Sequence, residues 1–303
     1  MGARNSLPAP SLFAVPASTA TALFDSAKRF TKSSVLGAGA ATVLLVVVVL
    51  AIFAPLLAPK DPLEANYSDL LRAPSFDFPL GTDGLGRDTL SRLIAGAQVT
   101  LMVSVIAVAV SKVIGFSWGV MSGYVGGRFD LISQRFLDVL LSFPSVILAL
   151  LLLVALGSGK WTVVIAIAAT GIAGTTRIIR SVSLSISQMD YVQAARAIGA
   201  SPLRVMAQHV APQCVAPLLV VASASLGGAI FTEAALSFLG LGIPPPDPSW
   251  GNMLGGILVA SFKPPWWLVA FPGAAITVTI LAFNLFGDAL RDHLDPKLRG
   301  RLD

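Results

Sequence analysis

One short run of the chain has the residue types of a phosphate-binding loop. Gly157-Ser158-Gly159-Lys160 matches the end of the P-loop pattern, in which backbone N–H groups cradle phosphates and a lysine reaches them. That pattern also requires a glycine where this chain has Val154, and Ser or Thr where it has Trp161. We therefore expect no nucleotide site here.

Other candidate chemical groups are equally incomplete. Asp83, Arg87 and Asp88 have the side chains of an acid–base or calcium site, but the glycines among them favour turns and local ion pairs. A single cysteine excludes an internal disulfide and a cysteine cage for a metal, and two histidines, His209 and His293, lie far apart. We expect no catalytic centre, no metal site and no cofactor in this chain, so any energy must come from partners.

Composition indicates a membrane protein. Hydrophobic residues make up 55% of the chain and charged residues 12%, against about 25% charged in soluble domains. The apolar residues form blocks of the ~20 residues that a helix needs to cross a bilayer. The net charge of +5 lies between these blocks, where it sets membrane orientation, so a nucleic-acid partner is not expected.

The blocks predict an all-α, polytopic protein with about six membrane helices. The expected spans are Val35–Leu57, Val99–Gly119, Leu131–Leu156, Trp161–Thr176, Val215–Leu239 and Trp266–Leu290. The expected divisions are a partly disordered or interfacial tail (1–34), the first span with an extracytoplasmic segment (35–97), a five-helix core (98–290) and a basic tail (291–303).

Lysine and arginine predict which way the chain crosses. If the N-terminus lies inside, fourteen Lys and Arg residues fall in inner segments and six in outer segments. Positive residues favour the cytoplasmic side, so both termini are expected there.

Two features inside the spans have alternative interpretations. Gly115, Gly119 and Gly123 form a stripe that suits close helix packing or a gating hinge. Lys112 is expected either to reach the membrane surface with its amine or to face the bundle.

A polar segment between the fourth and fifth spans predicts an elbow of two short helices, within 182–212. Residues 182–198 are expected to form a helix, with Gly199 just past its end, where positive φ is needed. Ser201 is a suitable N-cap and Pro202 a suitable first residue for a second helix that stops before Pro212. Small residues on such a pair let it seat in a groove of a soluble partner.

The elbow resembles a known signature. Gln193-Ala194-Ala195, Gly199 and Ala211-Pro212 have the spacing of the coupling motif of binding-protein-dependent ABC importer permeases. In that motif Glu-Ala-Ala precedes the glycine, and a Leu-Pro pair is usual. Gln193 keeps the size of Glu but lacks its charge, so an ion pair made there by the family is not expected in this chain.

Further blocks resemble the C-type permeases of the dipeptide/oligopeptide/nickel group. They cover about 30–300 in one register and include 81–88 with Ser91-Arg92, 123–127, 232–242, Pro248-Ser249-Trp250-Gly251 and Leu294-Asp295-Pro296.

The resemblance implies a type I ABC importer permease in a bacterial cytoplasmic membrane. It implies a second permease subunit, two ATPase subunits that bind ATP and Mg²⁺, and an extracytoplasmic solute-binding protein. The cargo implied is a dipeptide or oligopeptide, with nickel chelates, glutathione and other small solutes as alternatives. It also implies an ATPase-coupling surface, expected at Asp190, Gln193, Ala194, Ala195, Arg196, Gly199, Ser201 and Pro202.

Glu233 is a carboxylate inside an expected span, where charge is costly and usually functional. It either lies at an outer gate or on the peptide pathway, or is hydrogen-bonded within the bundle. Pro246 and Trp250 follow the fifth span in a proline-rich loop, which either presents a docking edge to the binding protein or is a rigid connector.

A rival function is an ion-coupled secondary transporter that works alone. Such proteins usually have paired intramembrane charges and broken helices in related repeats. The clear intramembrane ionisable residues here are Lys112 and Glu233, and no repeat is evident. The importer permease is therefore the favoured interpretation.

Overall fold

The structure is a computed structural model that describes residues 34–260 and 263–294. These residues form helices and no β-strand. The expected tails, 1–34 and 291–303, lie almost entirely outside them. The helices are α2 (Val35–Ile52), α3 (Ala54–Leu57), η1 (Tyr67–Asp69), α4 (Thr89–Val125), α5 (Gly127–Leu141), α6 (Ser145–Leu156), α7 (Lys160–Ser187), α8 (Asp190–Ala197), α9 (Pro202–Val205), η2 (Met206–Val210), α10 (Ala211–Phe238), α11 (Trp250–Ala260) and α12 (Trp266–Leu294).

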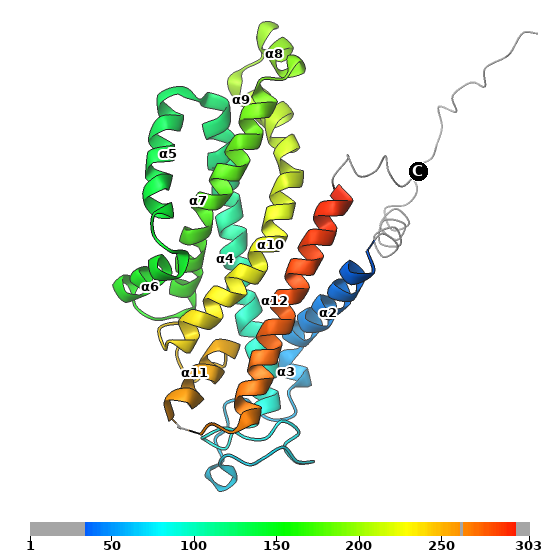
Figure 1. The fold of residues 1–303 in the computed structure, drawn as a ribbon, viewed down its shortest axis with the longest axis vertical. Coiled ribbons are helices and arrows are strands. Elements are labelled where there is room, and N and C mark those ends of the chain that lie inside the picture. The colour runs from blue at the N-terminus through cyan, green and yellow to red at the C-terminus, as the bar shows by residue number, and fades with distance from the viewer. Residues whose placement is uncertain (1–33, 261–262, 295–303) are drawn as a thin grey trace, which may run out of the picture.

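Long apolar helices make up the body of the molecule. Five are long and apolar enough to cross a membrane, and the bent pair of α5 and α6 would make a sixth. The expectation of an all-α membrane protein with about six spans is thus confirmed. Helices α8 and α9 lie at one end of the bundle, which we call the elbow end (Figure 1). The segment 58–88 lies at the opposite end, the loop end (Figure 1).

Helices α2 and α12 lie side by side, with the start of one next to the end of the other. A Cβ added at Gly37 would lie 2.4 Å from the Cβ of Ala289, so the helices touch there. Both neighbouring ends are directed toward the elbow end (Figure 1). The start of α2 and the end of α12 therefore lie on the same side of the bundle (Figure 1).

The first span begins where the sequence indicates and is then interrupted. The Ser34 side chain accepts a hydrogen bond of 2.9 Å from the Gly37 N–H and so caps α2. The expected helix Val35–Leu57 breaks at Phe53, because Pro55 cannot continue the hydrogen-bond ladder and instead starts the short helix α3.

Helix α4 extends well beyond the expected Val99–Gly119. Asp88 caps it by accepting a hydrogen bond of 2.8 Å from the Ser91 N–H, so the helix starts ten residues earlier, in a polar region that hydropathy does not identify. At 1.5 Å per residue its 37 residues span about 55 Å, longer than the ~30 Å of hydrocarbon. Its ends therefore project beyond the apolar layer.

The expected single helix Leu131–Leu156 is wrong. The chain instead forms α5 and α6, which meet at an angle of 88°. Pro144 lies at the break. Proline removes a backbone donor and disfavours helical geometry at Phe143 before it, which explains why the helix ends there.

Helix α4 packs closely along α7, and its glycine stripe makes the contact. A Cβ at Gly115, Gly119 or Gly123 would lie within 2.7 Å of α7 atoms, so only glycine allows the two backbones this approach. Lys112 donates a hydrogen bond of 2.8 Å to Thr175 on α7. The stripe is a packing surface, and Lys112 faces the bundle.

The sequence predicts a loop between the fifth and sixth spans, whereas the structure has the 11-residue helix α11 there. Its start is held by reciprocal bonds: Ser249 N–H donates to Asn252 (3.0 Å), and Asn252 N–H donates to Ser249 (3.2 Å). This Ser-x-x-Asn pattern resembles a capping box and is the sequence signal that identifies the helix. Gly251 and Gly255 let α11 lie against α10.

Candidate functional site

The elbow is built from the end of α7 onward. The expected helix 182–198 is wrong as one element, because α7 runs to Ser187 and α8 starts anew at Asp190. Asp190 is exposed in the first turn of α8, where the helix dipole favours a carboxylate. The two short helices α8 and α9 then reverse the chain toward α10 (Figure 1).

The turn between α8 and α9 has the expected backbone. Gly199 has φ +86°, a left-handed conformation that favours glycine. Ser201 occupies the N-cap position of α9 and Pro202 its first turn, but the Ser201 hydroxyl makes no capping bond. The prediction of the turn is confirmed, whereas the side-chain cap is not formed.

The inner face of the elbow is part of the hydrophobic core. Val192, Ala195 and Val205 are buried, and they pack in one cluster with Ile179 and Cys214. That cluster joins α8 and α9 to α4, α7 and α10. The elbow is therefore held firmly to the membrane helices.

Two polar side chains of the signature also hold the elbow. The Gln193 amide donates a hydrogen bond of 2.9 Å to the carbonyl of Ser187, the last residue of α7. A carboxylate could not donate this bond, so the local structure suits Gln. The Arg196 guanidinium lies over the Tyr124 ring, 4.5 Å from its centroid, so it packs against α4 rather than standing free at a rim.

The outer face of the elbow exposes small and apolar residues. Ile198 is 86% exposed and Leu203 71% exposed. Ala194, Gly199 and Pro202 are also exposed. We call these five residues the outer elbow face; such a small, apolar surface is typical of protein contacts.

The elbow continues into α10 without a loop. The second short helix does not stop before Pro212. Helix α9 passes through the π-helical turn η2 into α10, giving one helical span of 37 residues from Pro202 to Phe238. Pro212 is tolerated because it lies in the first turn of α10, where its missing N–H is not needed.

Glu233 lies on α10, toward the loop end, and its side chain is fully buried. Its Oε1 accepts a hydrogen bond of 2.8 Å from the Ser237 hydroxyl. The hydroxyls of Thr100 on α4 and Ser249 beside α11 lie near the carboxylate. Oε2 has no partner of good geometry within the described residues. The residue thus joins three helices and does not line an open path in this conformation.

The two expected docking residues lie in different environments. Pro246 is exposed in the proline-rich loop. Trp250 is only 3% exposed, and its indole N–H donates a hydrogen bond of 2.9 Å to the Leu93 carbonyl. The Trp250 side chain anchors α11 to α4, so it does not form an exposed docking edge here.

Sequence reasoning did not assign an ion-pair network beside the elbow. Arg180 on α7 donates to both carboxylate oxygens of Asp130 on α5, and the Ser122 hydroxyl on α4 donates to the same carboxylate. Arg177 similarly pairs with Asp138. The two arginines lie three residues apart on α7, and the two aspartates lie eight residues apart on α5. This spacing predicts the ion pairs only once it is known that α5 and α7 pack together.

Residues 115–300 match the family described as "Binding-protein-dependent transport system inner membrane component". The chain belongs to this family. Residues 23–74 also match the "N-terminal TM domain of oligopeptide transport permease C". The first match covers more than half of the chain and includes the whole elbow.

Individual relatives are similar to this permease over nearly their full length. The Pseudomonas aeruginosa (strain UCBPP-PA14) di/tripeptide transport system permease protein DppC is 42% identical over 84% of this chain and 86% of the relative. The Bacillus subtilis (strain 168) oligopeptide transport system permease protein OppC is 39% identical over 91% and 90%. An Escherichia coli glutathione transport system permease protein, GsiD, is 39% identical over 90% of both chains.

Members of this family are inner membrane components of a larger transport system. Membership of the family confirms the resemblance to C-type permeases of the peptide group that the sequence motifs indicate. The family description names a system that depends on a binding protein, which differs from a carrier that works as one chain.

Proposed function

We propose that this permease is the membrane-spanning subunit of an ATP-driven peptide importer. Its relatives include permeases named for dipeptides, oligopeptides and glutathione, itself a small peptide, which supports peptides as the cargo class. A second permease subunit, two ATPase subunits that bind ATP and Mg²⁺, and an extracytoplasmic binding protein complete the assembly. This chain carries the solute path, and the ATPases supply the energy.

The two-sided elbow is the observation that carries this proposal. Its inner face is packed into the core of the bundle, and the outer elbow face is exposed. A contact on the outer face is therefore transmitted to α7 and α10 without a flexible linker. We assign this face to the ATPase contact, with Asp190 and Gln193 at its edge. ATP binding to the ATPases then shifts the equilibrium between inward- and outward-facing states of the bundle. The size of the shift is set by the difference between the affinities of the two states for ATP.

The elbow end is proposed to be cytoplasmic. Over the full sequence, this orientation puts fourteen Lys and Arg residues in inner segments and six in outer segments, which agrees with the positive-inside rule. The test uses the full assembly in intact cells, with Cys214 replaced by alanine and one cysteine introduced by Ala197→Cys or Phe76→Cys. Both positions are exposed, at the elbow end and the loop end respectively. A membrane-impermeant maleimide should label Phe76→Cys only; labelling of Ala197→Cys from outside would overturn the proposal.

Docking is tested with Ala194→Arg, which places a bulky charge on the outer elbow face without disturbing a buried residue. Ala195 is unsuitable because it is buried in the chain's own core. The matched control is Phe76→Arg at the opposite end. We expect Ala194→Arg to lose co-purifying ATPase subunits and the control to keep them. Normal ATPase recovery with Ala194→Arg would argue strongly against the elbow as the contact.

A further inference from the structure

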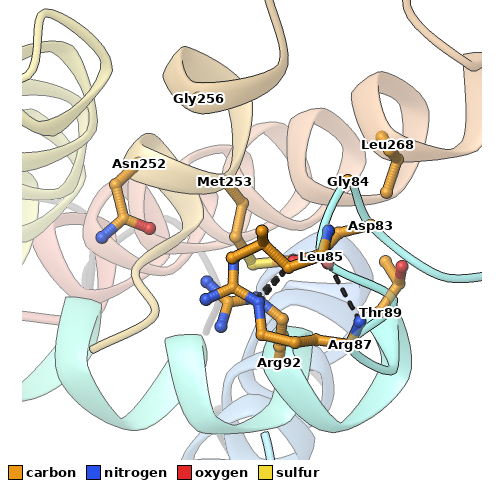
Figure 2. A pocket seen from close by; sticks show the side chains of 10 residues that line it. All are labelled: Asp83, Gly84, Leu85, Arg87, Thr89, Arg92, Asn252, Met253, Gly256 and Leu268. Carbon is orange, nitrogen blue, oxygen red and sulfur yellow. Dashed lines mark hydrogen bonds and ion pairs between the residues drawn. The ribbon is translucent and has the colours of Figure 1, made fainter. Parts of the chain in front are cut away.

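A pocket of about 290 Å³ lies at the loop end, between residues 83–92 and the helices α11 and α12 (Figure 2). It is separate from the elbow, which lies at the other end of the bundle (Figure 1). The 83–92 side contributes Asp83, Arg87 and Arg92 together with the apolar Leu85. The helices contribute Met253, Leu268 and the polar Asn252. The pocket therefore offers both charged and apolar side chains to a ligand.

The carboxylate in the pocket is already saturated by this chain. Asp83 Oδ1 accepts hydrogen bonds from the N–H groups of Leu85 (2.9 Å) and Arg87 (3.0 Å). Asp83 Oδ2 accepts from Arg87 Nε at 2.7 Å and lies 3.4 Å from Arg92 Nε. Four donors thus converge on one carboxylate, and it has little capacity left for a ligand.

The two arginines keep donors in excess. Within the described part of the chain, Arg87 is paired only through Nε and its backbone N–H, so its terminal nitrogens are not used. Arg92 is 5% exposed and uses one terminal nitrogen on the Pro62 carbonyl, at 3.0 Å. The nearby Asp88 carboxylate accepts from Ser91 instead. The carboxylates of Asp83 and Asp88 balance the two guanidinium charges. The terminal nitrogens of Arg87 and one terminal nitrogen of Arg92 nevertheless remain available to an acceptor group in the pocket.

Thr89 gives an independent indication of a ligand. It lines the same pocket and is fully buried. Its Oγ1 has no hydrogen-bond partner among the described residues. A buried hydroxyl without a partner is costly, and an acceptor group in the pocket would satisfy it.

Apolar side chains from both sides of the pocket indicate the kind of ligand. Leu85, Met253 and Leu268 present apolar surface to the pocket (Figure 2). We propose that this pocket binds the carboxylate of a small ligand that carries a short apolar group, as the C-terminal residue of a peptide does. The carboxylate contacts Arg87 and Arg92, and the apolar group lies against the helices. The assignment to a peptide rests on the proposed function.

The test measures binding to the full chain in its purified assembly. The probes are N-acetyl-leucine and N-acetyl-leucine amide, which differ in the carboxylate alone. Calorimetric titration should detect the acid and not the amide. Arg87→Gln removes a guanidinium and should weaken acid binding about tenfold or more. The control Arg72→Gln lies in the same segment, pairs with Asp69 and does not line the pocket, so it should bind as the natural chain does.

Three results would overturn the proposal. The acid and the amide bind equally, neither binds, or Arg87→Gln binds the acid normally. Arg87→Lys keeps the positive charge and should retain part of the affinity, which separates lost binding from failed folding. If the free acid does not bind but Arg87→Gln releases the solute-binding protein, the pocket holds an acidic side chain of that protein instead. Peptide uptake into proteoliposomes tests the proposed function separately, since it can fail while acid binding persists.

Discussion

The guanidinium of Arg196 and the ring of Tyr124 are in van der Waals contact across the junction of α8 and α4, with 4.5 Å between the guanidinium carbon and the ring centroid. Arg196 belongs to the elbow, whereas Tyr124 lies in the last turn of a membrane helix. The pair therefore fastens the elbow to α4, the longest α-helix among the described residues. Arg196 Nε has no hydrogen-bond partner within the described residues, so the ring is its main local partner.

Loss of this ring should loosen the elbow. We expect Tyr124→Leu to weaken the attachment of α8 by about 0.5–2 kcal/mol, the usual range for a cation–π contact. Tyr124→Phe keeps the ring and is the control. Hydrogen exchange of the amides in 190–205 should quicken in the Leu variant only; equal protection in both variants would contradict the role given to the ring.

The Asp130–Arg180 pair should matter more for stability than the pair beside it. Its side chains are 16% and 27% exposed, whereas Asp138 and Arg177 are each 48% exposed. We expect Asp130→Asn to cost about 1.5–3 kcal/mol and Asp138→Asn about 0–1 kcal/mol. Thermal unfolding in detergent measures both. Equal losses would show that burial does not distinguish the pairs.

Close approach of α4 and α7 should depend on individual glycines. Gly119→Ala places a Cβ 2.7 Å from the Thr176 carbonyl oxygen and 2.8 Å from the Ile179 Cβ, and overpacking of this kind costs about 1–3 kcal/mol. Gly174→Ala on α7 meets no atom within 4 Å and is the matched control. The melting temperature should fall for Gly119→Ala and stay the same or rise for the control. An unchanged Gly119→Ala would mean that the helices separate at little cost.

Glu233 should tolerate loss of its charge but not loss of its polarity. Glu233→Gln keeps an acceptor for Ser237 and adds donors toward the nearby hydroxyls, so we expect normal folding and peptide uptake. Glu233→Leu removes the acceptor of the Ser237 hydroxyl and should destabilise the chain by about 1–3 kcal/mol. Uptake in proteoliposomes and thermal unfolding measure the two effects. A folded Glu233→Gln variant without uptake would instead support a role on the peptide pathway.

Much of the fold is predictable from local signals. Blocks of apolar residues identify the membrane helices, and Gly199 identifies the turn of the elbow because few other residues accept its φ. The helix ends are less predictable, because hydropathy does not register polar helical turns. For this reason the predicted span Val99–Gly119 omits the first turns of α4, and the predicted span Trp161–Thr176 ends before the last turns of α7.

Side-chain environment was harder to predict than helix position. Trp250 follows four prolines within a few residues and looks like a loop tryptophan, yet it is buried because α11 folds back against α10 and α4. Arg196 looks like a surface charge, yet it packs on a ring 72 residues earlier in the chain. Both outcomes depend on contacts between distant segments, which spacing along one segment does not reveal.

The uninterrupted helix from Pro202 to Phe238 has a mechanical consequence. A push on the outer elbow face meets no non-helical linker, because residues 202–238 are helical throughout, with one backbone hydrogen bond lost at Pro217 inside α10. The far end of that rod carries Glu233 and Ser237, beside the residues that seat α11. In the proposed importer, motion at the ATPase contact would therefore pass along α10 to the residues at the loop end.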